Sequence, residues 1–342
     1  MSRSVSVMVA GIGGASLGSE ILKALRLVNR YRVFGCDISR TAYGLYEEGF
    51  AKTYLVERQD YVASVIAACR DAGAEILIPG GEAPMVLLGS QTSALRNAGI
   101  RLACNSPEVI ATCSNKAETF RVLTNLGIPI PRTAVVSDAA SIESVGIPCV
   151  VKPATGTGGS AMVFFATDVS EALIYAEYIQ RMGGTPIAQE YIPEEEGEFT
   201  VGVLSLPDRT IAGSIALRRS LDAKLSVMMR CRGGVISSGY SQGYIDDFPE
   251  IRVRCETIAR ALGSTGPLNI QGRIRDSVFV PFEINPRFSA STHLRALAGF
   301  NELDIYLQSI LNGEVSKTQE IRKGWYLRSL SEKFVAPEAI RS

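Results

Sequence analysis

The sequence predicts an α/β protein: a doubly wound parallel sheet comes first, and an α+β region rich in strands follows. Two observations lead to this prediction. Over the first 105 residues, short β-rich segments alternate with segments whose apolar residues recur at helical spacing. That alternation is typical of repeated βα units. From Ser106 onward strand-like segments dominate, and helices become fewer.

The N-terminal alternation can be followed segment by segment. In Ser19–Val28, for example, apolar residues stand at positions 21, 22, 25 and 28, which places them on one face of a helix. Strands are expected at Val5–Ala10, Tyr31–Cys36, Glu75–Pro79 and Ile100–Cys104. Helices are expected at Ser19–Val28, Tyr61–Ala72 and Ala83–Ala98.

The regular alternation of strands and helices ends between residues 105 and 130, which we take as a domain boundary. Ser106 followed by Pro107 is a helix start, and a second helix over Lys116–Leu126 ends at Gly127. The prolines of Ile128–Pro131 then impose an extended connector. Further strands are expected at Ala134–Val136, Cys149–Pro153, Met162–Ala166, Ile187–Tyr191 and within 198–285, and helices at Ser170–Arg181, Ile251–Leu262 and 292–312.

Composition excludes several classes of protein. Lys+Arg and Asp+Glu number 35 each, so the net charge is zero, which argues against a nucleic-acid binder. No run of eighteen apolar residues predicts a membrane span. The seven cysteines form no CxxC pair and His293 is the only histidine, so zinc and Ser-His or Cys-His sites are not expected. We expect a cytoplasmic protein, with a homodimer as the commonest assembly.

A glycine turn follows the first strand. Gly11, Gly13, Gly14 and Gly18, with Asp37 at the end of the second strand, resemble a dinucleotide fingerprint, although the spacing is not the strict GxGxxG. One hypothesis is therefore an NAD(P)-dependent oxidoreductase. The alternative is that the glycines only make the tight turn of a βαβ unit.

The second motif is Val150-Val151-Lys152-Pro153, followed by a loop that contains Gly156, Gly158, Gly159 and Ser160. A lysine at the end of a buried strand, before a glycine-rich loop, suits phosphate binding, because glycines let backbone N–H groups approach anionic oxygens. The order differs from that of a P-loop. A flexible hairpin with a lysine that reaches solvent is the alternative interpretation.

The third motif is the strand Ile187–Ile192, which leads through an acidic turn into a strand that begins at Glu198. An extended backbone between two domains can offer a C=O and an N–H to the edge of an adenine ring. The carboxylate of Glu198 is then a candidate ligand for the two ribose hydroxyls.

The last motif joins Asn269–Arg273 to Phe282–Arg287. On a strand, Glu283 and Asn285 point to one face and Phe282 to the other. A hairpin that turns at residues 275–277 would bring Gln271 close to Glu283. One carboxylate and two amide oxygens suit Mg²⁺, which prefers oxygen ligands. The alternative is an exposed hairpin end.

These motifs, in this order, resemble those of ATP-grasp enzymes, in particular the carbamoyl-phosphate-synthase-like branch and similar carboxylate–amine ligases. The resemblance rests on Asn115-Lys116, VVKP with its glycine loop, QEYI…GEFTV, NIQGR and FEINPRFS. It implies a Rossmann-like N-terminal domain followed by a two-lobed ATP-grasp fold. The implied domains are a Rossmann-like domain (1–105), a small lobe with linker helices and glycine-rich lid (106–192), a large lobe with the metal site (193–315) and a C-terminal extension (316–342).

The resemblance also implies roles for residues. Lys116 and Lys152 would contact the phosphates of ATP, and Arg287 would face the transferred phosphoryl group or the substrate carboxylate. Mg²⁺ or Mn²⁺ would be held by Gln271, Glu283 and Asn285. The remaining nucleotide contacts would come from Gly156, Gly158, Gly159, Ser160, Glu190, Tyr191, Ile192 and Glu198.

The implied activity is that of an ATP- and Mg²⁺-dependent ligase, which activates a small-molecule carboxylate as an acyl phosphate for attack by an amine. Two departures make bicarbonate a doubtful substrate. Ser289-Ala290-Ser291 stands where the synthases carry a further arginine, and their histidine has no counterpart within 212–235. Arg218, Arg219 and Arg230 are candidates to bind a larger anion. A nucleotide-binding protein without turnover is a further hypothesis.

Overall fold

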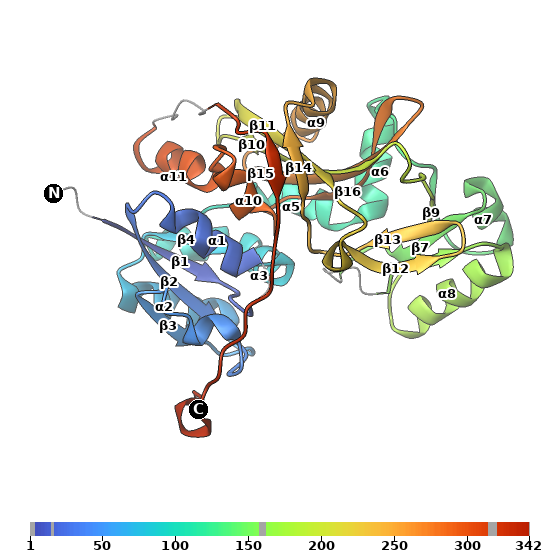
Figure 1. The fold of residues 1–342 in the computed structure, drawn as a ribbon. Coiled ribbons are helices and arrows are strands. Elements are labelled where there is room, and N and C mark those ends of the chain that lie inside the picture. The colour runs from blue at the N-terminus through green and yellow to red at the C-terminus, as the bar shows by residue number, and fades with distance from the viewer. Residues whose placement is uncertain (1–3, 15–16, 157–161, 314–319, 342) are drawn as a thin grey trace.

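The N-terminal part is a parallel sheet covered by helices (Figure 1). The computed structural model describes residues 4–14, 17–156, 162–313 and 320–341. The strand order is β3-β2-β1-β4-β5, and every pairing in this sheet is parallel. The elements are β1 (Val5–Ala10), α1 (Leu17–Arg26), β2 (Tyr31–Asp37), β3 (Lys52–Leu55), α2 (Tyr61–Ala72), β4 (Ile76–Pro79), α3 (Glu82–Gly89), α4 (Thr92–Asn97) and β5 (Arg101–Leu102).

The expected N-terminal elements are present, but one expected helix is wrong. Residues 83–98 form two helices, α3 and α4, instead of one. The break follows Gly89, whose backbone packs so closely on Ile110 that a Cβ atom there would lie 2.7 Å from the Ile110 Cδ1. The edge strand β3 was not predicted from the sequence.

The middle of the chain forms a four-stranded antiparallel sheet, in the order β6-β9-β7-β8, which we call the small lobe. Two capped helices lead into it: the Ser106 and Asn115 side chains accept hydrogen bonds from the first turns of α5 and α6. The elements are α5 (Pro107–Ser114), α6 (Lys116–Asn125), β6 (Thr133–Val135), α7 (Ala139–Val145), β7 (Cys149–Pro153), β8 (Phe164–Ala166), α8 (Val169–Arg181) and β9 (Pro186–Glu190).

A six-stranded antiparallel sheet, which we call the large lobe, has the order β16-β15-β10-β11-β14-β17. A separate hairpin, β12–β13, reaches from it toward the small lobe (Figure 1). The elements are β10 (Glu198–Ser205), β11 (Ile211–Arg219), β12 (Val227–Cys231), β13 (Gly234–Ser237), β14 (Gly243–Asp246), α9 (Pro249–Ala261), β15 (Pro267–Arg275), β16 (Val278–Asn285), α10 (Thr292–Leu297), α11 (Glu302–Asn312) and β17 (Gly324–Tyr326).

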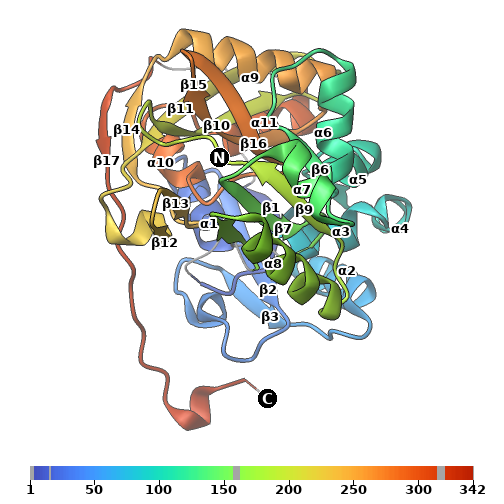
Figure 2. The ribbon, with the colours of Figure 1, turned by 90° about the vertical axis from the view of Figure 1, so that its right-hand side faces the viewer.

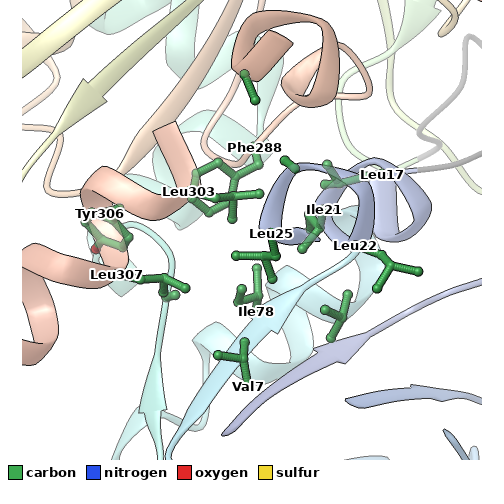
Figure 3. Packing of buried hydrophobic residues seen from close by; sticks show 14 of the residues in the cluster. Val7, Leu17, Ile21, Leu22, Leu25, Ile78, Phe288, Leu303, Tyr306 and Leu307 are labelled. Carbon is green, nitrogen blue, oxygen red and sulfur yellow. The ribbon is translucent and has the colours of Figure 1, made fainter. Parts of the chain in front are cut away.

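The N-terminal sheet and the large lobe share one hydrophobic core (Figure 3). Leu25 of α1 and Ile78 of β4 belong to the same buried cluster as Phe288, which follows β16, and Leu303 of α11. All four side chains are at most 2% exposed. Because Phe288 directly follows Arg287, this core fixes the end of the strand that carries several candidate site residues.

The C-terminal segment leaves the large lobe at β17 and runs as an extended arm along the N-terminal domain (Figures 1 and 2). Arg341 donates to the backbone oxygen and the hydroxyl of Thr53 in β3, each at 2.6 Å, and Lys333 donates to the backbone oxygen of Tyr46. The arm is therefore held against the N-terminal domain at its middle and at its end.

Six of the seven cysteines are buried thiols, and Cys231 is partly exposed. Burial raises the pKa of the Cys104 and Cys113 thiols to about 12. Such thiols are almost wholly protonated at neutral pH and react slowly. Within the described ranges, no helix has both the length and the apolar character that crossing a bilayer requires.

Candidate ATP-binding cleft

A cleft lies where the small lobe meets the β15–β16 hairpin and β13. Its walls come from strands of both lobes and from the loop that follows β13. It is lined by Lys116, Val150, Lys152, Pro153, Val163, Gln189, Glu190, Tyr191, Ile192, Val235, Ile236, Ser237, Ser238, Gly239, Ser241, Asn269, Gln271, Arg273, Phe282, Glu283, Asn285, Arg287, Ser289 and Ala290.

Lys152 lines the cleft and is almost completely buried. Its ammonium group donates to the Gln189 Oε1 at 2.7 Å and to the backbone oxygen of Phe282 at 3.1 Å. Burial lowers the pKa of Lys152 to about 7; the Glu283 carboxylate opposes this shift and the Lys116 ammonium group adds to it. Because the ammonium group is poorly solvated here, a nearby anion stabilises its charged form. A multiply charged anion, such as a phosphate chain, suits this position.

The backbone carbonyl of Phe282 can accept a hydrogen bond from Lys152 because Phe282 forms a β-bulge. The β15–β16 pairing aligns Gln271 with Glu283 and then Gly272 with Pro281, so Phe282 has no partner opposite it. A bulged residue leaves the ladder locally, which redirects its groups. The sequence places Phe282 on the face opposite Glu283, but in the structure Phe282 also lines the cleft. The backbone oxygen of Phe282, which accepts from Lys152, thus belongs to the cleft in addition to the predicted side chains.

The hairpin register brings the three predicted metal ligands together. Gln271 lies directly opposite Glu283, and Asn285 follows two residues later on the same strand. All three line the cleft. The set supplies one carboxylate and two amide oxygens, which fits the oxygen preference of Mg²⁺. Among the described residues no cluster of three His, Cys, Asp or Glu side chains could hold a metal, so a metal here depends on these amides and on oxygens of a bound phosphate.

Arg287 lies at the cleft end nearest the N-terminal domain. Its Nη1 donates to the backbone oxygen of Phe288 at 2.9 Å, and its buried Nε has no partner within the described residues. Burial lowers the pKa of Arg287, and the carboxylates of Glu283 and Glu82 oppose this shift. The unpaired donor is a place for an anionic oxygen of a ligand.

A small second cavity adjoins the cleft on the side of the N-terminal domain. Glu82, at the start of α3, and Ser114, at the end of α5, line it. Lys116, Glu283 and Asn285 line both the cavity and the cleft, so the two form a continuous polar region.

The connection between the lobes forms the opposite, mainly apolar wall. Tyr191 packs edge-on against Phe165 with ring centroids 4.8 Å apart, and both belong to a small core with Ile236 of β13. The Glu190 carboxylate pairs with Arg132 and Arg275, at 3.2 and 3.0 Å. The side chain of Glu190 is thus used within the protein, although Glu190 and Ile192 both line the cleft.

Glu198 is not brought into the cleft. Its side chain is completely buried and pairs with Arg219 at 3.2 Å and Arg273 at 2.8 Å. Arg273 also donates to the backbone oxygens of Ile192 and Val235, at 2.7 and 2.8 Å. Because two arginines already occupy the carboxylate, this structure offers a positioning role for Glu198 in place of the expected contact with ribose.

We expect Glu198→Gln to lower the free energy of unfolding by about 3 kcal/mol, because it leaves the buried Arg219 without its paired carboxylate and Arg273 with only the more distant Glu194, at 3.7 Å. Denaturant unfolding monitored by circular dichroism measures this. Glu195→Gln, at an exposed position in the preceding turn, is the matched control and should change stability by less than about 0.5 kcal/mol. Equal stabilities of the two variants would contradict the assignment.

The remaining predicted residues are distributed as follows. Lys116, at the first position of α6, lines the cleft, and its backbone N–H donates to Ala154 at 2.8 Å. Gly156 adopts a left-handed conformation, with φ of 70°, which favours glycine. Gly158, Gly159 and Ser160 lie outside the described residues.

The N-terminal glycine turn is stabilised from within. The Asp37 carboxylate accepts hydrogen bonds from the backbone N–H groups of Ile12 at 2.8 Å and Ser39 at 2.9 Å. A Cβ atom at Gly18 would lie 2.1 Å from the Gly11 oxygen, so this glycine is required for close packing. Both observations give the motif a structural role, and neither supports the oxidoreductase hypothesis.

Two features of the cleft were not recognised in the sequence. Gln189 holds Lys152, and the signal was a polar residue within an otherwise buried strand. The loop 238–241 lines the cleft because the buried Arg219 donates to the backbone oxygens of Ser238 and Tyr240, at 2.8 and 2.9 Å. Arg219 is therefore not available to an anionic substrate, and no local pattern marks it as a loop anchor.

Comparison with known families shows to which protein family this chain belongs. Residues 113–291, just over half of the chain, match the family described as ATP-grasp domain. The chain belongs to the ATP-grasp family. The matched residues include the small lobe, the large lobe except β17 and its last helices, and every residue that lines the cleft, whereas the N-terminal sheet and the C-terminal arm lie outside them.

Individual ATP-grasp relatives agree with this assignment. The carbamoyl phosphate synthase large chain of Rubrobacter xylanophilus is 28% identical over 235 residues, which are 67% of this chain and 21% of that protein. The chain thus spans about a fifth of the length of the curated relatives it matches.

Solved structures show the same fold. The N5-carboxyaminoimidazole ribonucleotide synthetase of Thermotoga maritima has a TM-score of 0.63 at 18% identity and covers 93% of this chain and 79% of its own. An L-amino acid ligase of Bacillus licheniformis has a TM-score of 0.66 at 16% identity and covers 91% and 75%.

Proposed function

We propose that this protein is an ATP- and Mg²⁺-dependent ligase, which activates a small-molecule carboxylate as an acyl phosphate and transfers it to an amine. The observation that carries the proposal is the hydrogen bond from the Lys152 ammonium group to the backbone oxygen of Phe282. Phe282 directly precedes Glu283, so a phosphate-binding cation and a metal-binding carboxylate lie at one place in the cleft. The ligase activities named for ATP-grasp relatives support the same class.

In this proposal the nucleotide lies along the cleft. Its base packs against the apolar wall formed by Val150, Tyr191 and Ile236, beside the backbone of Glu190 and Ile192. Its phosphates extend toward the buried end, where Lys116 and Lys152 supply positive charge. Glu198 is left out of the proposed nucleotide site, because its carboxylate is occupied.

Gln271, Glu283 and Asn285 would hold Mg²⁺ at the phosphate end. When bound, the ion would neutralise phosphate charge during transfer. The protein's own residues contribute positioning and fixed charge and form no covalent intermediate. Lys152 and Lys116 hold the triphosphate, and Arg287, which lines the same cleft, supplies a third positive charge near the place where charge accumulates.

The proposed reaction has two steps. A carboxylate oxygen of the substrate attacks the γ-phosphorus, the bond to the β-γ bridging oxygen breaks, and ADP leaves. A neutral amine then attacks the acyl carbon, phosphate leaves with the bonding electron pair, and the nitrogen loses a proton to give the amide. We place the carboxylate and the amine near Arg287 and the small cavity lined by Glu82.

The test has two stages. MgATP should raise the melting temperature and NADH should not, because only a ligand that binds the folded state stabilises it. ADP release is then measured over a set of carboxylates paired with amines, with each compound alone as the control. A shift with NADH and none with MgATP would overturn the proposal, and MgATP binding without ADP release in any pair would favour a protein without turnover.

A further inference from the structure

Arg328, on the C-terminal arm beyond β17, is buried among segments that come from three parts of the chain. Its side chain is 8% exposed and pairs with Glu20 of α1, which is 5% exposed, at 3.1 Å. The same guanidinium group donates to the backbone oxygen of Ala290 and, at 3.3 Å, to that of Ser241. Its backbone N–H donates to the Gln242 side chain at 2.9 Å.

The two carbonyls that Arg328 holds belong to residues that line the cleft. Ser241 ends the loop after β13, and Ala290 follows Arg287 by three residues. Neither segment is a regular element, so neither is fixed by a sheet ladder. A planar guanidinium group with several donors can hold a carboxylate and two carbonyls at the same time.

We propose that Arg328 is a positioning residue of the cleft. This inference rests on the proposed function. Arg328 fixes the segment at Ala290, behind Arg287, and the 238–241 loop against α1, and so sets the position of the γ-phosphate. The C-terminal arm, which lies outside the matched ATP-grasp residues, is then a functional part of the site.

The test compares Arg328→Lys with Arg341→Met. A lysine can keep the ion pair with Glu20, but its three donors diverge from one point and do not reproduce the planar spread with which the Arg328 Nε and Nη2 reach the two carbonyls. Arg341 lies on the same arm and contacts Thr53, away from the cleft, so its variant controls for loosening of the arm. Calorimetry gives the dissociation constants of MgADP and of the Mg²⁺ complex of a non-hydrolysable imido analogue of ATP.

We expect the wild type to bind the imido analogue more tightly than MgADP, and Arg328→Lys to reduce this preference about tenfold while MgADP affinity changes less than about twofold. The melting temperature should fall by less than about 2 °C, and Arg341→Met should keep the full preference. An unchanged preference in Arg328→Lys, or an equal loss in Arg341→Met, overturns the inference alone. Absence of nucleotide binding in the wild type overturns the proposed function and this inference together.

Discussion

Glu283→Gln is expected to reduce ADP release by more than about 100-fold and to leave the fold intact. Glu283 is the only carboxylate among the three predicted metal ligands, so the substitution removes the negative charge of the set. A neutral amide of the same shape should preserve the packing, although it removes a carboxylate whose charge favours the protonated forms of the buried Lys152 and Arg287. Steady-state ADP release at several Mg²⁺ concentrations measures the effect.

The matched control for Glu283→Gln is Asp276→Asn, at the turn of the same hairpin. Asp276 has a φ of 52°, a conformation that asparagine also tolerates. This variant should keep wild-type turnover. If Glu283→Gln retains most of its turnover at saturating Mg²⁺, with an unchanged melting temperature, the metal assignment is wrong.

Lys152→Met is expected to weaken MgATP binding by about 10- to 100-fold, because it removes a buried, charged hydrogen-bond donor from the phosphate end of the cleft. Calorimetric titration with MgATP checks this. Methionine has a similar length and no charge, so the cleft should keep its shape. An unchanged affinity would show that the triphosphate lies elsewhere.

The same substitution is expected to change how stability depends on pH. The pKa of Lys152 is about 7 in the folded protein, against 10.5 for an ordinary lysine. Between these values the unfolded chain binds one proton more than the folded chain, so this lysine makes wild-type stability rise with pH across that window. Below pH 7 both states are protonated and the contribution is constant.

Lys152→Met lacks this contribution. The melting temperature of the wild type, relative to that of the variant, should therefore rise between about pH 6.5 and pH 9. Lys224→Met, at an exposed position outside the cleft, is the control and should follow the wild type at every pH. A constant difference between the wild type and Lys152→Met would contradict a depressed pKa.

Local patterns predicted much of the fold. The bounds of β1, α2 and β7 follow the sequence to the residue, because periodicity and flanking turn residues act over a few positions. The proximity of Gln271 to Glu283 was also predictable, since a short hairpin turn places its two strands side by side, but their direct alignment depends on the bulge at Phe282. The division of the expected helix at 83–98 into α3 and α4 was not predicted.

Long-range contacts account for what the sequence could not predict in the site. Glu198 stands at the position expected of a nucleotide ligand, yet Arg219 and Arg273, on two other strands, occupy it. The sequence around each arginine gives no sign that it is more than an ordinary strand residue. The bulge at Phe282 likewise depends on pairing with β15, and Arg328 approaches the cleft only after the chain has completed both lobes.

The core shared by α1 and α11 has a consequence for dissecting the molecule. A fragment cut at the predicted boundary near residue 106 would keep Phe288 and Leu303 but lose Leu25 and Ile78, which cover them. Water would then reach a surface that is now sealed, close behind Arg287. The two lobes are thus not expected to fold as an independent fragment, because the N-terminal domain completes the core of the large lobe.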